Sequence, residues 1–85
     1  MADTRYVKEV KRLAKEALED YLLYSRFSKL SLGKSEDDAV YYQEVAMLHY
    51  EDAMRYSEKV AYLTCSSAED IFNEAYQKAV EDFNQ

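Results

Sequence analysis

Residues 31–38 read SLGKSEDD, and they contain the only glycine of an 85-residue chain that has no proline. Glycine and proline are the residues that most often interrupt helices. On both sides of Gly33, apolar residues recur with helical spacing over long stretches. Ser35, followed three residues later by Asp38, resembles the capping box that begins a helix. This stretch therefore predicts the tip of a long antiparallel helical hairpin.

The apolar periodicity predicts three helices within a single domain, residues 1–85. The expected helices cover about residues 4–30, 36–64 and 68–84. Alternation of the kind found in strands is absent, and β-branched residues are few. The predicted fold is therefore all-α: a long antiparallel hairpin plus a shorter third helix, a three-helix bundle that dimerisation could complete.

The expected ends of these helices carry capping residues. Asp3 or Thr4 can accept hydrogen bonds from the free amides at the start of the first helix. The third helix can begin after Ser66 or after Ser67, because each has an acidic residue three positions later. Either choice places a helix boundary directly after the second helix.

Charge is distributed unevenly between the two parts of the chain. The net charge is −6 at pH 7, with +3 on residues 1–34 and −9 on residues 35–85. A hairpin would therefore place a partly basic helix against an acidic one. We favour mutual compensation of these helices over the alternative, an acidic outer surface that repels or imitates nucleic acid.

Several features favour a protein of the cytoplasm. Cys65 is the only cysteine, which argues against a disulfide framework and fits a reducing compartment. Residues 1–5 contain no apolar segment typical of a secretory signal. No apolar run approaches the roughly 18 residues that a membrane span needs. We therefore expect a cytoplasmic chain that does not interact with membranes.

The third helix is too short to cover the whole hairpin. It should reach along the second helix only to about Met47, which leaves residues 18–30 and 36–46 without a third helix to pack against. That half of the hairpin is nevertheless rich in apolar residues, which predicts an interface with a protein partner or a second copy, a homodimer being expected. The alternative is that these side chains fill an ordinary core. The candidate interface residues are Leu22, Leu23, Phe27, Val40, Tyr41, Met47 and Leu48.

The sequence contains no set of residues typical of an enzyme active site, a metal site or a phosphate-binding loop. His49 is the only histidine, and with Asp52 it could form an acid–base pair, but no nucleophile accompanies them. One histidine and one cysteine cannot make a zinc site, and one glycine cannot make a phosphate-binding loop. We expect no enzymatic activity, no metal and no cofactor.

Basic residues gather on the first turns of the first helix. Acidic residues interrupt them, and the sequence pI of about 4.7 opposes a general affinity for phosphates. The sequence therefore favours a non-enzymatic protein–protein interaction module, such as a small acidic inhibitor or adaptor that binds a larger protein. The alternative is a nucleic-acid-associated protein that uses this basic face. The candidate basic patch consists of Arg5, Lys8, Lys11, Arg12 and Lys15.

Overall fold

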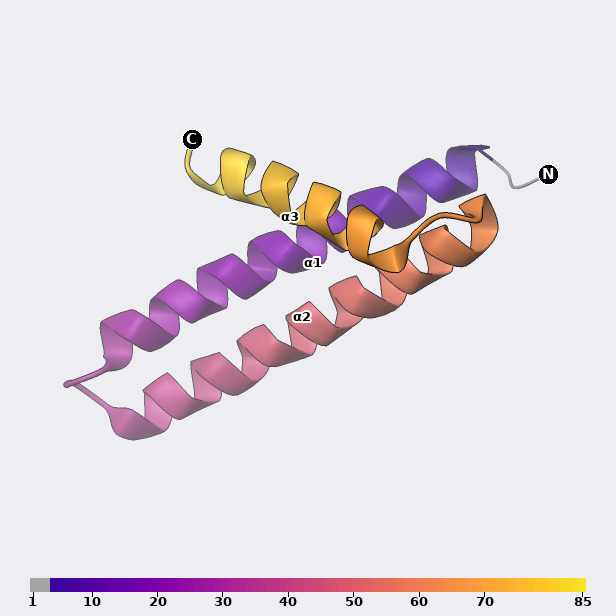
Figure 1. Ribbon diagram of the computed structural model, residues 1–85. Helices are drawn as coiled ribbons and strands as arrows, with labels where there is room; N and C mark the ends of the chain where they lie inside the picture. Colours follow the sequence, from indigo (N-terminus) through magenta and orange to yellow (C-terminus); the bar gives the residue numbers. More distant parts are fainter. Residues whose placement is uncertain (1–3) are drawn as a thin grey trace.

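A computed structural model describes residues 4–85, which form three helices and no strand (Figure 1). These helices are α1 (Thr4–Ser31), α2 (Glu36–Thr64) and α3 (Ala68–Phe83). The predicted all-α fold, a long hairpin with a shorter third helix, is confirmed. Thr4 is already helical, and the other expected cap, Asp3, lies outside the described residues.

The turn between α1 and α2 follows the local chemistry of its residues. Gly33 has a φ of 83°, in the left-handed region that glycine adopts without a steric penalty. The backbone N–H of Ser35 donates a 2.9 Å hydrogen bond to the Ser31 carbonyl oxygen. The Ser35 hydroxyl in turn accepts a 3.2 Å hydrogen bond from the backbone N–H of Asp38. The turn thus closes α1 and caps α2 within four residues.

The break between α2 and α3 is made without glycine. Cys65 has a φ of 54°, and its backbone N–H bonds to the Ala61 carbonyl oxygen, so a non-glycine residue takes the left-handed position after α2. Of the two predicted caps for α3, Ser67 is the one used: its hydroxyl accepts a 3.4 Å hydrogen bond from the backbone N–H of Asp70. Ser66 bonds instead to Thr64.

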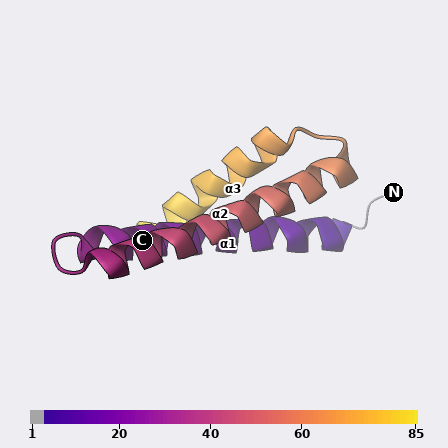
Figure 2. The same cartoon turned by 90° about the horizontal axis from the view of Figure 1, so that it is seen from below.

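The third helix lies obliquely on one face of the hairpin and runs in the same direction as α1 (Figures 1 and 2). The Cα atoms extend over 52 × 24 × 18 Å, so the molecule is long and narrow. The tip of the hairpin, around Gly33, projects beyond the C-terminal end of α3 (Figure 2). A two-helix segment therefore continues from a three-helix body.

The three-helix body has a core made mainly of small side chains. All three helices contribute to its main cluster, and a second cluster lies between the first turns of α1 and the last turns of α2. Alanines at these positions allow the helix backbones to approach closely. The main cluster contains Ala14, Ala17, Leu18, Ala53, Ala75 and Ala79, and the second contains Val7, Val10 and Val60.

The sequence predicted that residues 18–30 lack contact with the third helix. This prediction is wrong for the first residues of that range, Leu18 and Leu22. Leu18 is fully buried in the main cluster, and Leu22 packs against the same cluster. The reason is the tilt of α3, which brings Ala75 and Ala79 onto the side of α1 that carries both leucines. The third helix thus covers the hairpin about one turn farther than the sequence alone indicated.

Candidate functional site

A surface rich in exposed apolar side chains surrounds the tip of the hairpin. Six of the seven predicted interface residues are exposed, from 37% for Leu23 to 61% for Leu48. Two further leucines, Leu30 and Leu32, are exposed beside them and were not in the predicted set. We name this region the tip surface. It consists of Leu23, Phe27, Leu30, Leu32, Val40, Tyr41, Met47 and Leu48.

The seventh predicted interface residue, Leu22, does not belong to the tip surface. Its side chain is half-buried and packs against the main core cluster. Leu22 follows Leu18 by four residues, so both lie on the same side of α1, and that side faces α3. Leu22 is therefore a core residue of the three-helix body.

The tip surface continues around two sides of α2. Val40 and Met47 are seven residues apart and share one side, where Val40 lines a shallow hollow of about 260 Å³ together with Leu32. Tyr41 and Leu48 are likewise seven residues apart and share the neighbouring side. The predicted residues thus wrap around the hairpin instead of forming one flat face.

Aromatic rings pack against one another beside Tyr41. The Tyr24 ring lies parallel to the His49 imidazole, with 5.5 Å between centroids and 4° between planes. The Tyr42 ring has centroid separations of 5.5 Å from both Phe27 and Tyr41. Phe27 and Tyr41 are exposed, so the cluster forms part of the tip surface. Rings fixed in this way lose little conformational entropy when a partner covers them.

The environment of His49 differs from the sequence-based hypothesis. Asp52, the expected partner in an acid–base pair, forms an ion pair with Arg55. The Nδ1 atom of His49 lies 3.8 Å from Oδ2 of Asp20 on α1. His49 therefore connects the two helices of the hairpin through ring stacking and a long contact to a carboxylate.

The two helices present opposite charges at the tip. The last turns of α1 and the following turn carry Arg26, Lys29 and Lys34, all exposed. The first turns of α2 carry exposed acidic residues, namely Glu36, Asp37, Asp38 and Glu44. Within residues 4–85, none of these seven side chains takes part in an ion pair. Both signs are therefore available on the same surface.

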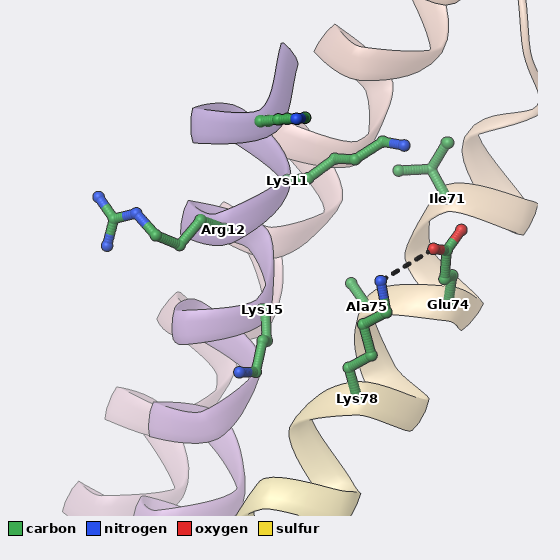
Figure 3. A pocket seen from close by; sticks show the side chains of 8 residues that line it. Lys11, Arg12, Lys15, Ile71, Glu74, Ala75 and Lys78 are labelled. Carbon is green, nitrogen blue, oxygen red and sulfur yellow. Dashed lines mark hydrogen bonds and ion pairs between the residues drawn. The ribbon is translucent and has the colours of Figure 1, made fainter. Parts of the chain in front are cut away.

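The predicted basic patch lies along a cleft between α1 and α3. The cleft has a volume of about 270 Å³, and Figure 3 shows it from close by. We name it the basic cleft. Four of the five predicted residues line it, all except Arg5, and α3 supplies the other side. The lining residues are Lys8, Lys11, Arg12, Lys15, Ile71, Glu74, Ala75 and Lys78.

Of the four cations that α1 contributes to the basic cleft, two are already paired with carboxylates. Arg12 bonds to Glu9, with 3.1 Å between Nε and Oε2, and also to Glu16, and these hydrogen bonds raise the pKa of Arg12. Lys15 pairs with Asp82 on α3, and its Nζ lies 3.4 Å from Oε1 of Glu19. The hydrogen bond that Lys15 donates to the Asp82 carboxylate raises the pKa of Lys15. The positive charge of Arg12 and Lys15 is thus largely compensated within the protein.

The other side of the basic cleft is centred on Glu74. Its Oε1 accepts a 3.1 Å hydrogen bond from Nζ of Lys78, and this bond lowers the pKa of Glu74, with a smaller contribution from the charge of Lys11. Lys11 points across the cleft towards Ile71, whereas Arg12 points away from α3 (Figure 3). Sequence reasoning missed Lys78, because nothing in the sequence shows which side of α3 faces α1.

Residues 4–85 contain neither a metal-binding cluster nor a membrane-spanning helix. Among residues 4–85, no three His, Cys, Asp or Glu side chains lie close enough together to hold a metal ion. None of the three helices combines the length and the hydropathy that a membrane span requires. Comparison with protein-family models, with curated proteins and with solved structures finds no match to this chain.

Proposed function

We propose that this chain is a non-enzymatic protein-interaction module that associates with a second copy of itself through the tip surface. One observation carries the proposal. Of the eleven large apolar side chains that are exposed within residues 4–85, eight belong to the tip surface. Water-soluble monomers rarely concentrate apolar residues in this way, whereas contact surfaces do.

The shape of the molecule supports a helical partner. The tip is a two-helix segment that extends past α3 (Figure 2), so each copy offers half of a four-helix arrangement. Two such segments packed together would bury apolar side chains that one copy leaves in contact with water. The hydrophobic effect then favours association, at about 25 cal/mol for each Å² of apolar surface removed from water.

The presence of both basic and acidic side chains at the tip favours a second copy of the chain as the partner. A two-fold interface uses the same surface on both copies and pairs residue i of one with residue j of the other, so a surface that carries both signs can match itself. Here Lys29 and Arg26 lie on α1 and Glu44 lies on α2, all exposed and without an ion pair in the described chain. A partner of uniform charge would be repelled by one of the two edges.

The test is the solution mass measured by light scattering, from about 5 µM to about 500 µM protein, a range that detects micromolar dimers. The wild-type chain should approach twice its 10.0 kDa mass as concentration rises. Leu48→Glu should remain monomeric, because it places a charge on the tip surface. Tyr62→Glu is the matched control: Tyr62 is 86% exposed, lies on the same helix and belongs to the other end of the molecule.

A wild-type chain that stays monomeric at every concentration would contradict self-association. The tip surface would then be assigned to a larger protein, in keeping with an inhibitor or adaptor role. Leu22→Glu is unsuitable for this test, because Leu22 packs against the core and its substitution would also destabilise the three-helix body.

A further inference from the structure

We propose that the basic cleft binds a small amphipathic anion, with its charged group between Lys8, Lys11 and Lys78 and its apolar part against Ile71 and Ala75. This inference is independent of the tip surface, which lies at the other end of the hairpin. The ligand class follows from three properties of the cleft: its cations, two of them unpaired and one in an exposed pair with Glu74, its apolar floor and the acidic residues that flank it.

The cations that remain available lie on both sides of the cleft. Lys8 and Lys11 are exposed on α1, and neither forms an ion pair with another residue of the described chain. Lys78 approaches from α3, where it forms an exposed ion pair with Glu74, and Lys11 extends towards the same helix (Figure 3). Three ammonium groups around one opening attract a single anionic group.

The floor of the cleft is apolar. Ala75 is buried and Ile71 is half-buried, and the aliphatic parts of the lysine side chains complete the walls. The volume of about 270 Å³ lies just below the range of about 300–1,000 Å³ for small-molecule sites, which suits a small ligand. An inorganic anion would leave this apolar surface in contact with water, so an attached apolar group of a few carbon atoms fits better.

Acidic residues around the cleft exclude long polyanions. Glu9 and Glu16 flank Arg12, and Glu19 and Asp82 flank Lys15. A nucleic acid that followed α1 would bring successive phosphates against these carboxylates, which repel them. The structure therefore favours one short anion over the nucleic-acid alternative for the basic face.

Glu74 occupies the position that the ligand's anionic group would take. Its carboxylate bonds to Lys78 and is influenced by the charge of Lys11. Both members of the Glu74–Lys78 pair are exposed, at 54% and 60%, so the pair is weak and an incoming anion can replace the carboxylate. Removing the charge of Glu74 should consequently strengthen binding of the ligand.

The test is a titration with n-hexyl phosphate, monitored by the backbone amide NMR signals of Ile71 and Ala75. Hexyl phosphate should bind at least about tenfold more tightly than inorganic phosphate or hexanol, since two buried methylene groups supply that factor. Hexanoate, tested in parallel, distinguishes a carboxylate ligand from a phosphate ligand. Equal affinity for hexyl phosphate and inorganic phosphate would overturn the amphipathic class.

The affinity of substituted chains for hexyl phosphate tests which residues form the binding site. Lys11→Gln and Lys78→Gln should each weaken hexyl phosphate binding about 1.5- to 5-fold, the range for losing one exposed charge contact. Lys11→Arg should retain binding, and Glu74→Gln should strengthen it. Lys59→Gln, which removes an exposed lysine of α2, is the control. Unchanged binding to both Lys11→Gln and Lys78→Gln, or loss of binding on Leu48→Glu, would contradict the assignment.

Discussion

The hydroxyl of Ser28 donates a 2.7 Å hydrogen bond to the carbonyl oxygen of Ala39, across the two helices of the hairpin. Both residues are buried, with 8% and 4% of their surface exposed, although they lie in the two-helix segment that α3 does not cover. A serine opposite an alanine lets the helices approach closely enough for a side chain to reach the opposite backbone. This contact fixes the alignment of α1 and α2 near the tip.

Enlarging Ser28 should disrupt this alignment. Ser28→Leu is expected to lower the free energy of unfolding by about 1–3 kcal/mol, because a bulky side chain must separate the helices. Ser28→Ala removes only the hydrogen bond and should cost about 1 kcal/mol or less. Urea denaturation measures both. Equal effects for the two variants would show that the close approach is unimportant.

Leu18 should be one of the most sensitive core positions. It is fully buried among side chains from all three helices, so Leu18→Ala is expected to cost about 2–5 kcal/mol of unfolding free energy. Leu23→Ala is the control, because Leu23 is 37% exposed and lies on the tip surface. Thermal unfolding at low protein concentration compares the two. A smaller loss for Leu18→Ala than for Leu23→Ala would contradict the described core.

Cys65→Gly should stabilise the protein. The left-handed conformation costs a non-glycine residue roughly 1–2 kcal/mol, and the greater freedom of glycine in the unfolded chain offsets about 0.5–1 kcal/mol of the gain. The net increase in unfolding free energy should be about 0.5–1 kcal/mol. Cys65→Ala removes the thiol but keeps the Cβ atom, and it should bring no such increase. A melting temperature that is the same for both variants would argue against the strained cap.

The charge pattern at the tip predicts that complementary variants recognise each other. Lys29→Glu alone and Glu44→Lys alone should each reduce self-association, because like charges then face each other across the interface. An equimolar mixture of the two variants should form more dimer than either variant alone. Light scattering at low salt provides the comparison. A mixture with the average mass of its components would refute matching of the two edges.

The ion pair between Lys15 and Asp82 links α1 to α3 and predicts a pH dependence. The pKa of Lys15 is raised above its usual value near 10.5, so the stabilisation is complete below about pH 10.5 and decreases as the pH rises through the higher folded-state value. Wild type should therefore melt above Lys15→Met at pH 8, and the difference should shrink above pH 10.5. A difference that is constant from pH 8 to pH 11.5 would contradict this dependence.

The sequence was sufficient to predict the helices and their ends. Gly33 and Ser35 mark the turn, because each supplies a backbone conformation or a hydrogen bond that acts over a few residues. The start of α3 was predicted at Ser66 or Ser67, and the structure uses Ser67. The observed ends lie within one residue of those predicted. Such local interactions depend little on the rest of the fold, which is why single residues could identify them.

The sequence did not predict how α3 sits on the hairpin. Its tilt determines that Leu18 and Leu22 are covered and that Lys78 lines the same cleft as Lys11. These contacts join residues more than fifty positions apart, and several orientations of one amphipathic helix would satisfy the same periodicity. The candidate sites were therefore predicted only where they depend on one helix or on the hairpin turn.

Cys65 offers a single labelling position for measuring the distance between the same point on two copies of the chain. It is the only cysteine of the chain, it is exposed, and it lies at the open end of the hairpin, away from Gly33. One spin label attached there marks the same end of every copy. In a tip-to-tip pair the two labels would be separated by more than the 52 Å length of one chain, whereas copies lying parallel along their full length would hold them within the combined width of two molecules.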